Sequence, residues 1–258
     1  MADYDIIGNI AIIKTEKNGK AKSKTQKLKE AKEILKRPSI KTVLEKSSDI
    51  KGRLRTFKTK HISGEKTLIA DYKENNCKFK LNVDTCYFSP RQSNDRKQLA
   101  KTIKKNQEVL VMFSGICAYP LIIYRIAKPK KITAIEISKE CTKYAKENKK
   151  LNKIPEEKLE IIQGDVKKKM PNKKFDVIVM VRPNLKTTFL EQALNVAKRG
   201  TKIHYQGFSR PDELKDLKKQ LIDEAKILKR NIKIIKIIKA GDIAPHKFRY
   251  RLLINVLN

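Results

Sequence analysis

The sequence predicts an α/β protein in which a small α+β domain precedes a larger Rossmann-like sheet that ends in an antiparallel pair of strands. From about Asp95 onward, apolar strand-like runs alternate with helical stretches, as in a doubly wound sheet. The first of these strands breaks at Gly115, where the first loop of such a sheet turns. The last two strand-like runs, 231–239 and 247–256, follow one another with no helix between them.

Residues 1–84 form the smaller predicted domain. We expect a strand over 7–14, a lysine-rich helix over 22–37 and a strand over 41–46. Further short strands are expected over 53–58, 66–71 and 77–83, the last after the turn-forming residues Glu74-Asn75-Asn76. Basic residues outnumber acidic ones throughout 14–60, so we expect this domain to contact a polyanion.

Residues 85–258 form the larger predicted domain. Before the final pair, strands are expected over 108–113, 131–136, 158–162, 175–181 and 201–206. Helices are expected over 119–127, 138–150, 186–198 and 211–229. A sheet that closes with two antiparallel strands is typical of class I methyltransferases and unusual among dehydrogenases.

The net charge of +33 is extreme, with 61 basic residues against 28 acidic ones. A field of this size attracts polyanions, so nucleic acid is the expected partner. The alternative explanation is a lysine-rich proteome, from an AT-rich genome or a hot habitat. No apolar run reaches the ~18 residues of a membrane span, and the N-terminus carries acids where a signal peptide is basic. We therefore expect a cytoplasmic protein that does not enter a membrane.

The four cysteines, Cys77, Cys86, Cys117 and Cys141, include no CxxC pair. The chain also has only three histidines. This spacing does not match a structural zinc site, so we expect no metal and reduced, mostly buried thiols.

The loop after strand 108–113 reads FSGICAYP and keeps one glycine where a dinucleotide-binding loop has three. Because a pyrophosphate needs close approach of the backbone, this loop disfavours NAD and FAD, whereas S-adenosylmethionine carries no phosphate. Glu136, at the end of the second strand, can accept both ribose hydroxyls of an adenosyl group, or can be an acid at a helix start. Asp165, at the end of the third strand, can reach an adenine amino group, or can be a turn or N-cap residue. Together they predict a site for S-adenosylmethionine.

Two further segments are candidates for catalysis. The fourth strand leads into Val181-Arg182-Pro183-Asn184, where amine methyltransferases often place a loop that orients the target nitrogen; a plain turn is the alternative. Upstream, YFSPRQSNDR offers Asp95 as a general base and Arg96 as a group that stabilises an electron-rich oxygen. A capped helix start is the competing interpretation of that segment.

The segments YFSPRxxxDR, MFSGICAYP, AIEIS, QGDV, FDVIVMxxPN and IHYQGF resemble, in order and spacing, the archaeal tRNA guanosine-37 N1-methyltransferases. The similarity spans nearly the whole chain. It implies a class I fold that uses S-adenosylmethionine to methylate N1 of the guanine 3′ to the anticodon, and a monomer that binds the anticodon loop of tRNA. The altered loop after the fourth strand points to the wyosine-related branch of this family.

The resemblance also implies roles for individual residues. Asp95 takes the place of the family's general base, which is usually a glutamate, and Arg55 that of an arginine implicated in holding the guanine. Pro183 and Asn184 belong to the loop that orients the target nitrogen. The residues implied to line the cofactor site are Arg96, Phe113, Gly115, Glu136, Ile137, Asp165, Val166 and Val181.

Three functions stay open at this point. The first is methylation of guanosine 37, alone or with C7-methylation of the tricyclic wyosine precursor in tRNA-Phe. The second is transfer of the aminocarboxypropyl group of the same cofactor. The third is RNA binding without catalysis, suggested by Val111, Cys117 and Val181 at positions where the family carries other residues.

Overall fold

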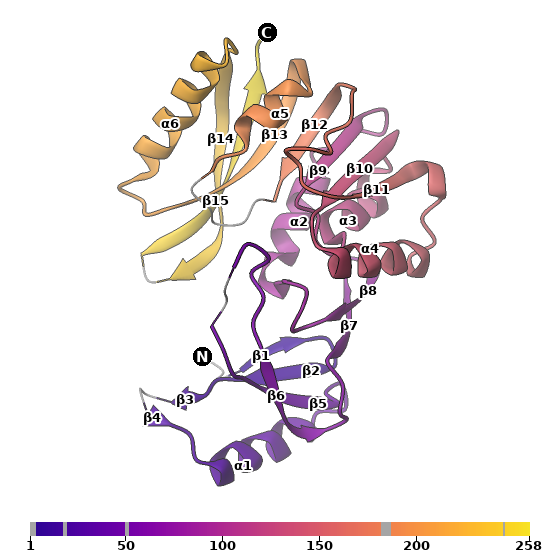
Figure 1. Cartoon of the computed structure of the whole chain (residues 1–258), viewed down its shortest axis with the longest axis vertical. Helices are drawn as coiled ribbons and strands as arrows, with labels where there is room; N and C mark the ends of the chain where they lie inside the picture. The colour runs from indigo at the N-terminus through magenta and orange to yellow at the C-terminus, as the bar shows by residue number, and fades with distance from the viewer. Residues whose placement is uncertain (1–3, 18–19, 50–51, 182–186, 245) are drawn as a thin grey trace.

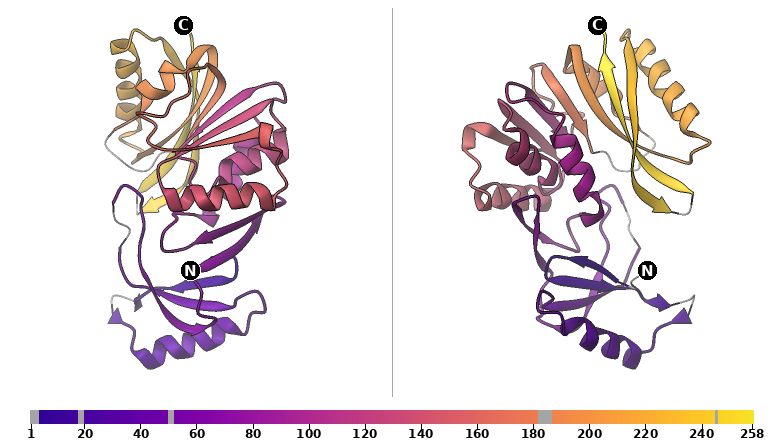
Figure 2. Two further views of the ribbon diagram at one scale, coloured as in Figure 1. Left: turned by 45° about the vertical axis from the view of Figure 1, so that its right-hand side comes forward. Right: turned by 180° about the vertical axis from the view of Figure 1, so that it is seen from behind.

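The structure is a computed structural model that describes residues 4–17, 20–49, 52–181, 187–244 and 246–258. Figure 1 shows a small N-terminal module at one end of the molecule and a larger sheet with flanking helices at the other. The side and back views in Figure 2 show the same two-part shape. No helix among the described residues is both long and apolar enough to cross a membrane.

The N-terminal module is a four-stranded sheet covered by one helix. Its strands lie in the order β1 (Tyr4–Ile7), β2 (Ile10–Ile13), β5 (Thr42–Lys46) and β6 (Thr59–Gly64), and only β2 and β5 are parallel. The helix is α1 (Lys24–Leu35), which begins at a capping box made by Ser23 and Gln26. The short strands β3 (Glu16–Lys17) and β4 (Lys20–Ala21) pair with each other between β2 and α1.

Two expected strands of this module differ in the structure. The run 7–14 is split at Gly8, which has a φ of +58° and turns the chain into the β1–β2 hairpin. A Cβ atom on Gly8 would lie 1.8 Å from the carbonyl oxygen of Asp71, so the turn also needs glycine for this close approach. The expected strand 53–58 is wrong, because Gly52 and Arg55 adopt φ values of +70° and +56° and form a turn instead.

A β-hairpin joins the two parts of the molecule. It consists of β7 (Ile69–Glu74) and β8 (Cys77–Asn82), and it turns at Asn75 and Asn76, both in the left-handed region. The side chains of Asn148 and Asn152 each donate to and accept from the backbone of β8, at Lys80 and Lys78, with distances of 2.6–3.0 Å. The hairpin is therefore fastened to the larger part. The domain boundary after residue 84 stays a prediction.

The larger sheet has seven strands. Their order is β11 (Leu159–Gln163), β10 (Lys131–Glu136), β9 (Glu108–Met112), β12 (Phe175–Met180), β13 (Ala197–Ser209), β15 (Lys247–Val256) and β14 (Ile232–Ala244). The first five are parallel, and β15 runs antiparallel to both of its neighbours. This confirms the predicted fold class, including the final antiparallel pair.

Helices cover both faces of this sheet because its central strands are apolar on both sides. In β9, Val109 and Val111 belong to the core formed with α3 (Ala118–Ala127) and α4 (Lys139–Leu151). Leu110 and Met112 belong to the opposite core with α5 (Leu190–Asn195) and α6 (Leu214–Ile227). Helix α2 (Ser93–Ala100) follows the short helix η1 (Pro90–Gln92) and packs on the α3 side, and η2 (Glu156–Lys158) leads into β11.

The elements of this domain follow the expected ranges closely except in one region. The helix expected over 186–198 is described only as α5, Leu190–Asn195, and β13 is longer than the expected 201–206. At its end β13 is extended by pairing with β15 as far as Ser209, and at its start Ala197 pairs with Phe175 of β12. All four cysteines are free and buried, as expected.

A candidate cofactor and substrate cleft

A cleft lies at the carboxyl ends of the parallel strands, where α/β sheets bind their ligands. Its empty volume is about 1070 Å³, counted out to its open mouth. One wall follows β9, β10 and β11, and another follows β13 and β15. The turn Arg53–Arg55 of the N-terminal module closes a third side, so both parts of the chain build the cleft.

The loop after β9 orients Glu136. Phe113, Gly115 and Cys117 all have φ between +56° and +65°, so the loop turns tightly although it holds a single glycine. The N–H of Gly115 donates to one oxygen of Glu136 at 2.7 Å, and the N–H of Ser138 donates to the other at 2.8 Å. Burial raises the pKa of Glu136, and these backbone hydrogen bonds act against that rise.

The neighbouring wall combines an acid with apolar side chains. Asp165 follows β11 and accepts from the N–H of Lys167 at 3.0 Å and from Arg53 at 2.8 Å. Partial burial acts to raise the pKa of Asp165, but these two donors outweigh it and the pKa is lowered. The apolar part of the cleft includes Ile137, Val166, Val181 and the edge-to-face pair of Phe113 and Phe189, whose ring centroids lie 4.9 Å apart.

These residues fit S-adenosylmethionine. The ligand offers a ribose diol and an adenine amino group as donors, and the cleft presents the carboxylates of Glu136 and Asp165 beside apolar walls that can hold a purine ring. A Cβ on Gly115 would meet no atom nearer than 4.0 Å, so the backbone of this loop is open to close approach by a ligand. The structure brings all the residues predicted for the cofactor site to one cleft; their individual roles stay predictions.

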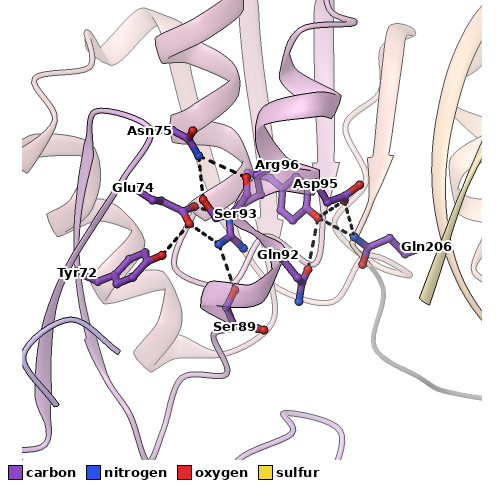
Figure 3. Close-up of polar contacts among 10 residues, drawn as sticks. Tyr72, Glu74, Asn75, Ser89, Gln92, Ser93, Asp95, Arg96 and Gln206 are labelled. Carbon is purple, nitrogen blue, oxygen red and sulfur yellow. Dashed lines mark hydrogen bonds and ion pairs between the residues drawn. The ribbon is translucent and has the colours of Figure 1, made fainter. Parts of the chain in front are cut away.

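Arg96 lies in the cleft wall as half of a buried ion pair. Its guanidinium donates to both carboxylate oxygens of Glu74, at the turn end of β7, and to the carbonyl oxygen of Ser89 at 3.1 Å (Figure 3). Tyr72 donates to the same carboxylate at 3.1 Å, and burial raises the pKa of Tyr72 to about 12. The charge of Arg96 is therefore balanced inside the protein, and the pair ties the β7–β8 hairpin to α2.

Asp95 is placed behind the cleft wall. It is 7% exposed and is absent from the cleft lining, because α2 turns its carboxylate toward β15. One oxygen accepts from Nε of Arg251 at 2.7 Å, and the other accepts from the hydroxyl of Tyr119 at 2.7 Å. Tyr119 lines the cleft and also accepts from the amide of Gln206 at 2.7 Å. The amide of Gln206, which also lines the cleft, donates to the same Asp95 oxygen at 3.4 Å. The expected general base thus reaches the cleft through Tyr119 and Gln206.

The network extends behind Arg251 to a buried histidine. A terminal nitrogen of Arg251 lies 3.3 Å from Nδ1 of His204, whose Nε2 lies 3.3 Å from the hydroxyl of Thr102. Burial first, and the charge of Arg251 second, lower the pKa of His204 to about 3. A neutral ring with its proton on Nε2 satisfies both contacts, since Arg251 can only donate.

Arg55 is among the residues that line the cleft, and its role in holding the guanine stays a prediction. Its guanidinium stacks over Tyr87 at 4.6 Å from the ring centroid, and its Nε has no hydrogen-bond partner in the described part of the chain. Pro183 and Asn184, predicted to orient the target nitrogen, lie outside the described residues, as does Arg182.

Sequence reasoning missed the polar residues on the antiparallel strands. His204 and Gln206 lie on one face of β13, and on β15 Arg251 pairs with Gln206 and Arg249 with Phe208. The sequence did contain a signal, because Arg249 and Arg251 stand two residues apart in a predicted apolar strand. In a strand, this spacing places both side chains on the same face of the sheet.

The profile of the TRM5/TYW2 methyltransferase domain matches residues 70–237, and that of the TYW2 N-terminal domain matches residues 1–67. The chain belongs to the TRM5/TYW2 methyltransferase family. This confirms the predicted family, and with it S-adenosylmethionine as the cofactor that the cleft residues fit.

Members of the family that are similar to the chain include proteins of different activity. The tRNA (guanine(37)-N(1))/4-demethylwyosine(37)-methyltransferase Taw22 of Nanoarchaeum equitans is 30% identical over 98% of this chain and 99% of its own length. The tRNA(Phe) (4-demethylwyosine(37)-C(7)) aminocarboxypropyltransferase of Methanocaldococcus jannaschii is 33% identical over 58% of this chain and 57% of its own. The crystal structure of Trm5b from Pyrococcus abyssi superposes with a TM-score of 0.86 at 29% identity, covering 99% of this chain and 75% of that one.

Proposed function

We propose that this TRM5/TYW2 family member is a tRNA methyltransferase that methylates N1 of guanosine 37 and also C7 of the wyosine precursor at the same position. The observation that carries the proposal is the composite cleft, in which Arg53 and Arg55 of the N-terminal module meet the Glu136 and Asp165 wall. The dual activity is supported by the relative from Nanoarchaeum equitans, which aligns with this chain over nearly the full length of both proteins.

When bound, S-adenosylmethionine supplies an electrophilic methyl group to the target atom. In the proposed complex, Glu136 holds the ribose, because Gly115 and Ser138 orient its carboxylate, and Asp165 faces the adenine. The target base lies against the other half of the cleft, where Gln92 and Gln206 offer amide groups to its edge. The guanidinium of Arg55, whose Nε has no hydrogen-bond partner among the described residues, stabilises the base carbonyl oxygen as N1 loses its proton.

The proposed acceptor of the N1 proton is Asp95, reached through Tyr119. The proton of N1 passes to the Tyr119 oxygen while the hydroxyl proton of Tyr119 passes to Asp95, 2.7 Å away. Burial, together with the charge of Asp95, raises the pKa of Tyr119 well above its usual value, so the phenol keeps a proton to hand on. Gln206 fixes the Tyr119 oxygen from the other side at 2.7 Å.

The reaction is tested on the product. The purified enzyme is incubated with S-adenosylmethionine and two tRNA-Phe substrates, one with guanosine 37 and one with the wyosine precursor, and nucleoside 37 is analysed by mass spectrometry. We expect the mass of one methyl group to be added to each. A tRNA with adenosine at position 37 is the control. Substrates of unchanged mass would refute the proposed function.

The relay is tested by removing one hydroxyl. Tyr119→Phe should lower the single-turnover rate by about 10²–10⁴-fold, the usual contribution of general acid–base catalysis. The loss should be smaller at high pH, where N1 ionises without help. Tyr124→Phe, on the same helix but outside the cleft lining, is the matched control. A Tyr119→Phe enzyme with the wild-type rate at every pH would exclude the relay.

Aminocarboxypropyl transfer is the second candidate function. It is favoured by the match of residues 1–67 to the TYW2 N-terminal domain and by the similarity to the transferase of Methanocaldococcus jannaschii. The same mass spectra distinguish it, because the added group is heavier than methyl. The non-catalytic alternative requires an empty cofactor cleft, so calorimetric binding of S-adenosylmethionine would exclude it.

We also propose that tRNA is bound at its anticodon loop by a monomer in the cytoplasm. The charge of +33 supports a polyanionic partner. The four free, buried cysteines are in keeping with a reducing compartment. Analytical ultracentrifugation with and without tRNA tests the stoichiometry.

A further inference from the structure

Arg249 carries a buried charge without a partner among the described residues. It is 6% exposed, its Nε makes no hydrogen bond, and no described carboxylate lies within ion-pair distance of it. Its side chain lines the substrate half of the cleft. Its guanidinium lies over the ring of Phe208, 5.7 Å from the ring centroid, and its charge acts to lower the pKa of Tyr119 against the larger effect of burial.

The sheet is built to leave room for this guanidinium. In the register of the strands, Arg249 lies between Phe208 on β13 and Gly241 on β14. Gly241 has a φ of +141° and offers no side chain, and a Cβ atom there would lie 3.6 Å from a terminal nitrogen of Arg249. The guanidinium is therefore packed between an aromatic ring and a bare backbone, at the wall of the cleft, and its Nε has no hydrogen-bond partner among the described residues.

Arg251, two residues further along the same strand, is a buried arginine with a structural role and serves as the comparison for Arg249. It is 2% exposed and is neutralised by Asp95 at 2.7 Å. A buried charge without such a partner costs several kcal/mol of desolvation free energy. Arg249 carries this desolvation penalty in the folded protein, and hydrogen bonds to an oxygen of a ligand would offset it.

We propose that Arg249 binds an anionic or electron-rich oxygen of the target nucleotide, either its phosphate or the carbonyl of its base. This inference rests on the proposed function. The position of β15 favours the nucleotide over the cofactor, because β13 and β12 separate β15 from β9, and β10 and β11 lie beyond β9. At about 4.8 Å per strand, β15 lies about 14 Å from β9. The planar fork of arginine suits both oxygen sources.

The first test needs no substrate. Arg249→Met removes the charge and keeps an apolar chain of similar length, so the ligand-free protein should melt at a higher temperature than wild type. Arg251→Met should melt at a lower temperature, since it leaves Asp95 unpaired. Arg249→Met melting below wild type would show that Arg249 has a structural partner and would overturn the proposal.

The second test measures transfer. Arg249→Met should lower the single-turnover rate on tRNA by about 10²–10³-fold, the effect of losing a charged donor at a reacting site, while binding S-adenosylmethionine within about twofold of wild type. Arg249→Lys should recover part of the rate. Lys233→Met, an exposed lysine at the far end of β14, controls for the change of net charge. Wild-type transfer by Arg249→Met, or its loss of cofactor affinity, would overturn the proposal.

The third test separates the two oxygen sources and the two proposals. Guanosine 5′-monophosphate and guanosine are added to wild type and Arg249→Met, and the melting temperature is measured. Stabilisation of wild type by the monophosphate alone identifies the phosphate as the ligand, and stabilisation by both compounds identifies the base carbonyl. Neither should stabilise Arg249→Met. A wild-type protein that transfers no methyl group but shows this Arg249-dependent stabilisation would refute the proposed function and leave the Arg249 site supported. If neither compound stabilises wild type, the Arg249 site is refuted.

Discussion

Arg251→Met should destabilise the protein strongly, although Arg251 is not among the residues that line the cleft. The substitution leaves the buried carboxylate of Asp95 without its cation and removes the donor to Nδ1 of His204. Both partners of the ion pair are nearly inaccessible, with side chains 2% and 5% exposed. Breaking such a pair by removing one partner costs about 3–5 kcal/mol, most of it from the charge left behind.

The expected change is large enough to measure by thermal unfolding. For a chain of this size, about 1 kcal/mol corresponds to about 2–4 °C, so we expect the melting temperature to fall by about 6–20 °C. The change in urea midpoint, at unchanged slope, checks the same quantity. Arg199→Met, at an exposed position of β13, should leave both values near those of wild type.

A double-mutant cycle identifies the cause. Adding Asp95→Asn to Arg251→Met removes the stranded charge, so the double variant should be less destabilised than the sum of the two single variants by about 0.5–3 kcal/mol. An Arg251→Met protein that melts within about 2 °C of wild type would show that the pair contributes no net stability. Strict additivity in the cycle would show that the two residues do not interact.

Three further predictions follow from the geometry. Glu136→Gln should weaken S-adenosylmethionine binding, measured by calorimetry, by about 10–150-fold. This factor corresponds to about 1.5–3 kcal/mol, which is what hydrogen bonds to a charged group contribute. Glu160→Gln, at an exposed position of β11, is the control and should leave the affinity unchanged. The pKa of His204 is lowered to about 3 in the folded protein. Below pH 6.5 the unfolded chain therefore binds a proton at this residue that the folded chain does not bind. The free energy of unfolding should fall between pH 6.5 and 3 by up to about 1.4 kcal/mol per pH unit. Urea titrations of His204→Gln should lack this part of the slope; equal slopes would contradict the assignment. Gly8→Ala should cost more than about 1 kcal/mol, since its Cβ would meet Asp71; an unchanged melting temperature would refute that.

The cofactor wall could be predicted from the sequence because its signals are local. An apolar strand followed by Gly115, and acids at the ends of the next two strands, fall on one edge of a parallel sheet whatever surrounds them. The same holds for the final antiparallel pair, which needs only the absence of a connecting helix. The expected strand at 53–58 was wrong because nothing local indicated that Gly52 and Arg55 turn the chain toward the cleft.

Only the tertiary structure decided that Asp95 has a cationic partner and that Arg249 has no ion-pair partner among the described residues. Asp95 meets Arg251 from 156 residues away, and Arg53 meets Asp165 from 112 residues away. The sequence of a helix does not show whether one of its carboxylates faces a substrate or a buried cation. The sequence alone determined the fold, the family and the cofactor side of the cleft. Only packing across the sheet determined which buried charges are neutralised within the described part of the protein and which are not, because the energy of a buried charge depends on neighbours that the chain brings together from far apart.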